Sequence, residues 1–71
     1  MLLGFDMARK FTVVLEQEGS VCTARCLELD IVSQGKSFGN ALDNAREAIT
    51  IFLENNPKSK PKQINVALVE V

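Results

Sequence analysis

Residues 37–54 read SFGNALDNAREAITIFLE, and this stretch decides the fold class of the chain. Apolar residues recur in it at helical spacing and form one stripe, while polar residues cover the opposite side. Ser37 stands just before the stripe and is a favourable N-cap residue, because its hydroxyl can accept a hydrogen bond from the first helical turn. We therefore predict an amphipathic helix over residues 38–54, with Gly39 as a weak point in its first turn. The stripe comprises Phe38, Ala41, Leu42, Ala45, Ala48, Ile49, Phe52 and Leu53.

Two alternating segments before the helix predict a β-hairpin. Residues 10–17 and 20–27 place apolar side chains at alternate positions, as expected for strands with one buried face. Glu18 and Gly19 then form a two-residue loop, since glycine tolerates a positive φ. A three-residue loop would set Val13 opposite Arg25, so the two-residue loop is favoured. The favoured register defines a core face on which the pairs are Leu15 with Cys22, Val13 with Ala24 and Phe11 with Cys26.

The rest of the chain completes an α+β domain. Residues 29–34 predict a short third strand, residues 55–62 a polar connector with two prolines, and residues 64–71 a last, β-branched strand. We expect the order β-β-β-α-β in a single domain over residues 1–71, with residues 1–8 as a flexible N-terminal segment. The first three strands form an antiparallel meander. A right-handed crossover through the helix then places the last strand beside the first and parallel to it, giving the sheet order 3-2-1-4.

A chain of 71 residues has a small core, and domains of this size commonly add a disulfide, a metal or a partner subunit. The chain has no histidine, and its two cysteines alone cannot complete a zinc site. Cys22 and Cys26 would lie about 13 Å apart along one strand face, beyond the ~7 Å Cα limit for a disulfide. We interpret both as buried core residues in a reducing cytoplasm. We expect no metal or cofactor, and we expect association with another chain.

The face of the sheet away from the helix is predicted to be a contact surface. Apolar side chains recur on it, and a large exposed apolar patch usually marks an interface. Scattered exposed valines are also normal on protein surfaces, but their clustering and the small core favour a contact. The predicted partner or oligomer interface comprises Val14, Val21, Leu27, Val32, Val69 and, off the helical stripe, Ile51.

The arrangement of ionisable residues does not predict catalysis. General acid–base chemistry near neutral pH usually uses histidine, which is absent, and the middle of the first strand holds no carboxylate. The carboxylates lie at the two ends of the hairpin and on the solvent side of the helix, whereas two-metal chemistry needs them in one site. A net charge of −1 gives no strong footprint for nucleic acid, and no apolar run reaches the ~20 residues that span a bilayer. We expect a non-enzyme with neither direct DNA binding nor membrane attachment.

Several segments resemble the N-terminal domain of the HicB antitoxins. They are FTVVLE at residues 11–16, LDIVSQGKS at residues 29–37, ALDNAREAI at residues 41–49 and FLE at residues 52–54. The Ser-Gln-Gly-Lys-Ser turn followed by the Ala-Leu-x-Asn-x-x-Glu-Ala helix is the most specific of these features. The resemblance covers about residues 10–54. It implies a partial ribonuclease-H-like fold without the catalytic carboxylates of that fold.

The same resemblance implies a prokaryotic, cytoplasmic antitoxin that covers a small, basic, RNA-cleaving toxin of the HicA type and forms a homodimer or homotetramer. An acidic rim of Glu28, Asp30 and Glu47 would face the basic toxin. The sequence departs from the family in three places. Phe38-Gly39-Asn40 replaces an acidic first helical turn, Leu27-Glu28-Leu29 replaces a proline-containing loop, and we expect no DNA-binding segment after the last strand. The alternatives are an orphan homo-oligomeric domain without a toxin and, third, a small-ligand or RNA-binding regulator.

Overall fold

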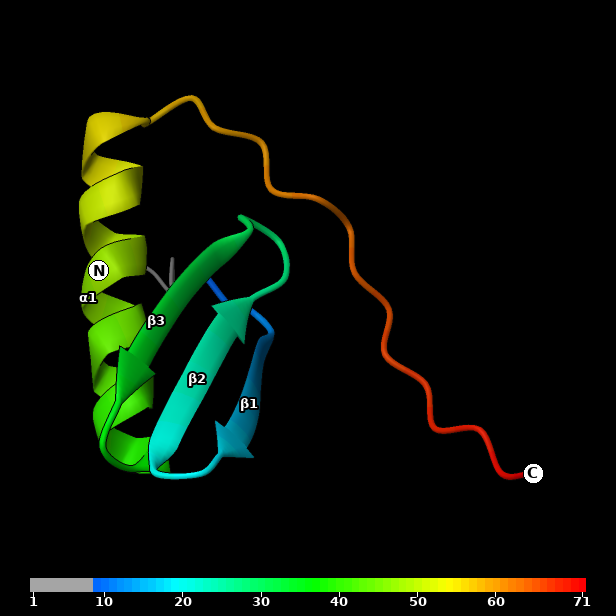
Figure 1. Cartoon of the computed structure of the whole chain (residues 1–71). Helices are drawn as coiled ribbons and strands as arrows, with labels where there is room; N and C mark the ends of the chain where they lie inside the picture. The colour runs from blue at the N-terminus through cyan, green and yellow to red at the C-terminus, as the bar shows by residue number, and fades with distance from the viewer. Residues whose placement is uncertain (1–8) are drawn as a thin grey trace, which may run out of the picture.

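The computed structural model describes residues 9–71 and shows a three-stranded antiparallel sheet packed against one helix (Figure 1). The elements are β1 (Val13–Glu18), β2 (Val21–Cys26), β3 (Ile31–Gly35) and α1 (Phe38–Asn55). The strands lie in the order β1-β2-β3, so the predicted meander is confirmed. The flexible segment predicted for residues 1–8 lies outside the described residues. No helix within residues 9–71 is long and apolar enough to cross a membrane.

The hairpin between β1 and β2 differs from the predicted register by two residues. Glu18 pairs with Val21, so the loop consists of Gly19 and Ser20, and Leu15 pairs with Ala24 instead of Cys22. Gly19 has a φ of 63°, and a glycine at the first loop position with a positive φ is the pattern of a type II′ turn. A shift of two residues keeps every side chain on its predicted face, because the side-chain period of a strand is two.

The core is built from small side chains. Its buried members are Cys22, Ala24 and Cys26 from β2 and Ala41, Ala45 and Ile49 from α1. Small residues on both elements let the helix axis approach the sheet closely. The helix packs mainly on β3 and β2 and least on β1. As a result two predicted core residues are exposed, Leu15 by 37% and Phe38 by 43%.

The turn between β3 and α1 is held by three side chains. Ser37 is the N-cap as predicted, and its Oγ accepts a hydrogen bond from the Asn40 backbone N–H at 3.0 Å. The Asn40 side chain in turn accepts from the Lys36 backbone N–H at 3.0 Å, and Asn44 Nδ2 donates to the Gln34 carbonyl at 2.7 Å. A Cβ atom on Gly35 would lie 2.5 Å from the Ala41 backbone nitrogen. The close approach of β3 to the start of α1 therefore requires glycine at this position.

The predicted fourth strand is wrong, and with it the sheet order 3-2-1-4. Residues 59–71 form no helix or strand, and the described sheet ends at β1 and β3. The apolar, β-branched composition of residues 64–71 is not sufficient, because strand preference depends on pairing and on burial against neighbours. We call these eight residues the tail; they run away from the body of the protein (Figure 1). The radius of gyration is accordingly 14.2 Å, against about 11 Å for a compact chain of this length.

The connector before the tail is anchored to the turn between β2 and β3. The Lys62 backbone N–H donates to the Glu28 carbonyl at 3.1 Å, and Lys62 Nζ lies 2.5 Å from Asp30 Oδ2. Asp30 itself has a φ of 57°, a left-handed conformation that Asp tolerates better than most residues. These contacts fix the point at which the tail leaves the body.

Candidate functional site

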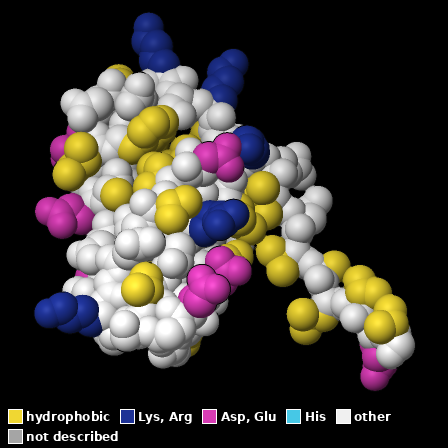
Figure 2. All heavy atoms as spheres, in the orientation of Figure 1, with side chains coloured by type: hydrophobic (Ala, Val, Ile, Leu, Met, Phe, Trp, Pro, Cys, Tyr) yellow, Lys and Arg dark blue, Asp and Glu magenta, His cyan; other side chains and the backbone are white. Residues whose placement is uncertain are grey.

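The outer face of the sheet, which we define as the face turned away from α1, carries a mixture of valines and charged side chains. Val14 and Val32 flank Arg25 in one row of paired residues and are exposed by 40% and 53%. The next row holds Glu16, and Arg25 Nη2 lies 4.0 Å from Glu16 Oε1. Val21 stands at the hairpin end, about 13 Å along β2 from Arg25. On the side shown in Figure 2, hydrophobic side chains accordingly form separate patches with charged groups between them.

The six residues predicted as one interface fall in different parts of the molecule. Val14, Val21 and Val32 share the outer face. Leu27 lies half-buried in the turn after β2, and Val69 lies in the tail with 81% of its surface exposed. Ile51 is half exposed on α1, which covers the opposite face of the sheet. The structure thus brings three of the six onto one surface.

The predicted acidic rim is divided in the same way. Glu28 and Asp30 lie together in the turn between β2 and β3, whereas Glu47 lies exposed on α1. The Glu28 carboxylate accepts hydrogen bonds from the hydroxyl and the backbone N–H of Thr12, both at 2.7 Å. The hydrogen bond from the Thr12 hydroxyl is the main cause that lowers the pKa of Glu28. Since Asp30 pairs with Lys62, two of the three carboxylates serve contacts within the chain.

The two cysteines are buried and free, as the sequence predicted. Burial raises the pKa of the Cys26 thiol, and its Sγ lies 3.9 Å from Glu28 Oε1. A thiol of this kind stays protonated near neutral pH and is a poor nucleophile. Among residues 9–71, no three His, Cys, Asp or Glu side chains gather closely enough to hold a metal ion.

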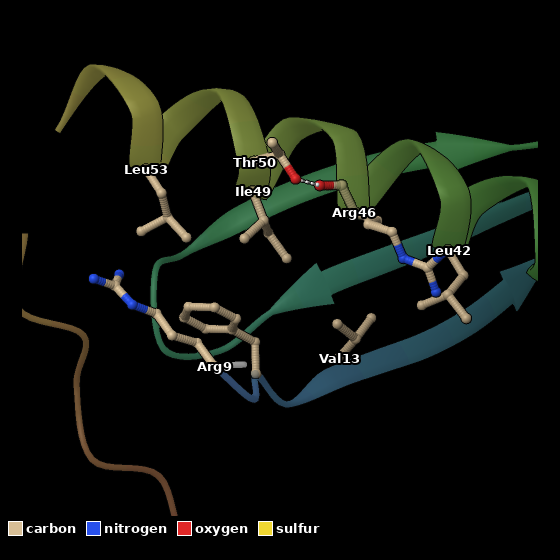
Figure 3. A pocket seen from close by; sticks show the side chains of 8 residues that line it. Arg9, Val13, Leu42, Arg46, Ile49, Thr50 and Leu53 are labelled. Carbon is tan, nitrogen blue, oxygen red and sulfur yellow. Dashed lines mark hydrogen bonds between the residues drawn. The ribbon is translucent and has the colours of Figure 1, made fainter. Parts of the chain in front are cut away.

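A groove that the sequence did not predict lies between α1 and the chain at the start of β1 (Figure 3). Its volume is about 560 Å³, and most of its lining is apolar. Figure 3 shows the Arg9 side chain toward the Leu53 end and the guanidinium of Arg46 toward the Leu42 end. The lining residues are Arg9, Phe11 and Val13 on one side and Leu42, Arg46, Ile49, Thr50 and Leu53 on the other.

One feature of the sequence could have indicated this groove. The apolar stripe of the helix is wide, and it includes Leu42, Ile49 and Leu53 on the flank toward β1. The three-stranded sheet covers this flank only in part, because α1 packs mainly on β2 and β3. The groove therefore lies along the part of the helical stripe where Leu42 and Leu53 are only partly buried.

Comparisons of the chain with models of protein families, with curated protein sequences and with solved structures find no match.

Proposed function

We propose that this chain is a non-catalytic protein-binding module of the HicB antitoxin type, which neutralises a small, basic, RNA-cleaving toxin of the HicA type by covering it. The observation that carries the proposal is the open outer face, where Val14 and Val32 lie beside Arg25 and Glu16. A non-obligate protein interface is only about as apolar as the rest of a protein surface, and arginine is enriched in it. The turn at residues 33–37 and the helix pattern after it support the resemblance on which the toxin assignment rests.

The charge of the outer face suits a basic partner. Glu16 and Glu18 are exposed on β1, and both side chains lie on the same face as Val14. Carboxylates at the margin of an interface attract a basic protein and raise its association rate. The Glu28–Asp30 turn is retained as the proposed acidic rim, and Asp30 would exchange Lys62 for a cation of the toxin. Glu47 lies on α1, beyond the opposite face of the sheet, and is left out of this rim.

The proposal places the protein in the cytoplasm of a prokaryotic cell, in contact with protein partners and without a cofactor. The free thiols of Cys22 and Cys26 suit a reducing compartment. The RNA that the toxin would cleave lies in the same compartment. In this account the chain forms a homodimer or homotetramer and does not bind DNA itself.

An orphan homo-oligomeric domain without a toxin is the second candidate. The exposed apolar tail favours it, because Leu68 is 100% exposed and Val69 81% exposed. A contiguous apolar surface of this kind usually belongs to a contact with another chain. This candidate accounts for the tail without any partner of a different sequence.

Affinity capture separates the two candidates. The tagged full-length chain is recovered from its native cell lysate at moderate salt, and proteins that co-elute in stoichiometric amount are identified by mass spectrometry and assayed for RNA cleavage. We expect a small basic protein that is lost with Val14→Asp and retained with Ile51→Asp. Ile51 is the matched control because it is similarly exposed but lies on α1, beyond the opposite face of the sheet. Recovery of the chain alone would refute the antitoxin proposal.

A further inference from the structure

The tail combines features that are unusual for a surface segment. Residues 64–71 read INVALVEV, and the exposed fractions are 69% for Val66, 100% for Leu68 and 81% for Val69. The side chains line the segment as a nearly continuous hydrophobic run (Figure 2). Strand-forming residues in an extended, unpaired segment present unpaired backbone N–H and C=O groups, together with apolar side chains, to a partner.

The edge of β1 offers the complementary surface. β1 pairs with β2 on one side and has no neighbouring strand on the other among the described residues. An edge strand of this kind can accept another strand through its free N–H and C=O groups. The groove begins at the same edge, since Phe11 and Val13 line it. A strand added beside β1 would place every second side chain in the groove, beneath α1.

The sequence of the tail matches the groove in polarity and in charge. One alternation consists of Ile64, Val66, Leu68 and Glu70, and the other is smaller and partly polar. The first alternation would set three apolar side chains on the apolar floor of the groove. Because an arginine stands toward each end of the groove, Glu70 would meet a guanidinium whichever way the strand runs (Figure 3).

We propose that two copies of this chain exchange tails, so that residues 64–71 of each copy form an additional strand on the β1 edge of the other and fill its groove. The occupant is a second copy because Lys62 is held at Glu28 and Asp30, and from there the tail runs clear of its own sheet (Figure 1). The exchange is reciprocal, so it closes as a two-fold dimer. It requires no toxin and leaves the outer face of each sheet open.

The test compares two neighbouring substitutions in the full-length chain by sedimentation equilibrium. The wild-type chain should sediment at twice its mass of 7.8 kDa. Leu68→Asp places a charge in the apolar groove and should raise the dimer dissociation constant by about tenfold or more. Val69→Asp lies on the other alternation and should leave the constant within about threefold of wild type. Both residues are exposed in the single chain, so neither change can unfold it.

A second measurement assigns the contact to two chains. In a sample mixed from differently isotope-labelled copies, NMR contacts between the Leu68 methyl groups and those of Ile49 or Leu53 should connect one copy to the other. A monomer at all concentrations would overturn the proposal, as would equal effects of the two substitutions or contacts that arise only within one chain. Val14→Asp on the outer face should leave the dimer mass unchanged. The mass therefore reports on the tail exchange, and capture of the toxin reports separately on the outer face.

Discussion

Replacement of Gly35 by alanine should destabilise the domain although it adds only one methyl group. The new Cβ would lie 2.5 Å from the Ala41 backbone nitrogen and 2.9 Å from the Ala41 Cα. Backbone atoms cannot rotate away, so the start of α1 must move off β3. That movement strains the hydrogen bonds of Asn40 and Asn44 that join the two elements.

The magnitude follows from two opposing effects. Gly35 has no positive φ, so alanine would gain about 0.4–1 kcal/mol by restricting the unfolded chain. Overpacking costs about 1–3 kcal/mol, and partial loss of the N-cap costs about 1 kcal/mol. The steric effect is larger, and we expect a net loss of about 2 kcal/mol from a domain whose core supplies roughly 3–5 kcal/mol.

Urea unfolding followed by far-ultraviolet circular dichroism measures this loss, with Gly39→Ala as the matched control. With a slope near 1 kcal/mol per molar urea, the midpoint of Gly35→Ala should fall by about 2 M. The nearest atom to a Cβ on Gly39 is Ser37 Oγ at 4.0 Å, so that alanine should stabilise α1 by about 0.5–1 kcal/mol. A midpoint for Gly35→Ala at or above that of the wild type would refute the close-approach argument.

Three further predictions concern the cap, a carboxylate and the core. Ser37→Ala removes the oxygen that accepts from the Asn40 N–H, and should cost about 1 kcal/mol by urea unfolding; an unchanged midpoint would contradict the N-cap role. The pKa of Glu28 is lowered below 4.5 by the Thr12 hydrogen bonds, so the unfolded state binds more protons at acid pH. The stability that this carboxylate contributes is present above pH 4.5 and is lost as the pH falls through the folded pKa. Glu28→Gln should make the melting temperature depend less on pH in the acid range. A melting temperature that depends on pH as in the wild type would count against the role of Glu28. Ala45→Leu inserts bulk where the exposed fraction is 0% and should destabilise by about 1–3 kcal/mol, a result that an unchanged melting temperature would exclude.

The sequence predicted the elements whose signals are local. The helix begins at Phe38 after the Ser37 cap and ends at Asn55, one residue beyond the predicted end. Its apolar stripe and the capping hydroxyl are contained in the segment itself, so no distant contact was needed to identify it. The faces of β1 and β2 were also predicted, because alternation fixes which side chains share a face.

Features that depend on pairing between distant segments were not predicted correctly. The apolar alternation of the hairpin is equally satisfied by two registers that differ by two residues, and the conformation of Gly19 decides between them. Residues 64–71 have strand composition, but composition does not specify which edge, or which chain, they pair with. The groove was not predicted for the same reason, since it lies where β1 leaves Leu42 and Leu53 on α1 only partly buried.

The composition of the outer face was predicted in part, whereas its role as an interface stays a prediction. Alternation correctly grouped Val14, Val21 and Val32 on the face away from α1. It did not show that Arg25 and Glu16 interrupt that face as an ion pair. It also did not predict that Asp30 pairs with Lys62, because Lys62 lies far along the chain and is brought to Asp30 only by the path of the connector.

Titration of toxin activity tests the central proposal most directly. The captured basic protein would be assayed for RNA cleavage while the full-length chain is added in increasing amount, with Val14→Asp and Ile51→Asp chains titrated in parallel. We expect cleavage to fall linearly and to end at a fixed stoichiometric ratio. The Ile51→Asp chain should inhibit as the wild type does, and the Val14→Asp chain should fail to inhibit. Cleavage that continues in the presence of excess wild-type chain would rule out neutralisation of the toxin by this chain.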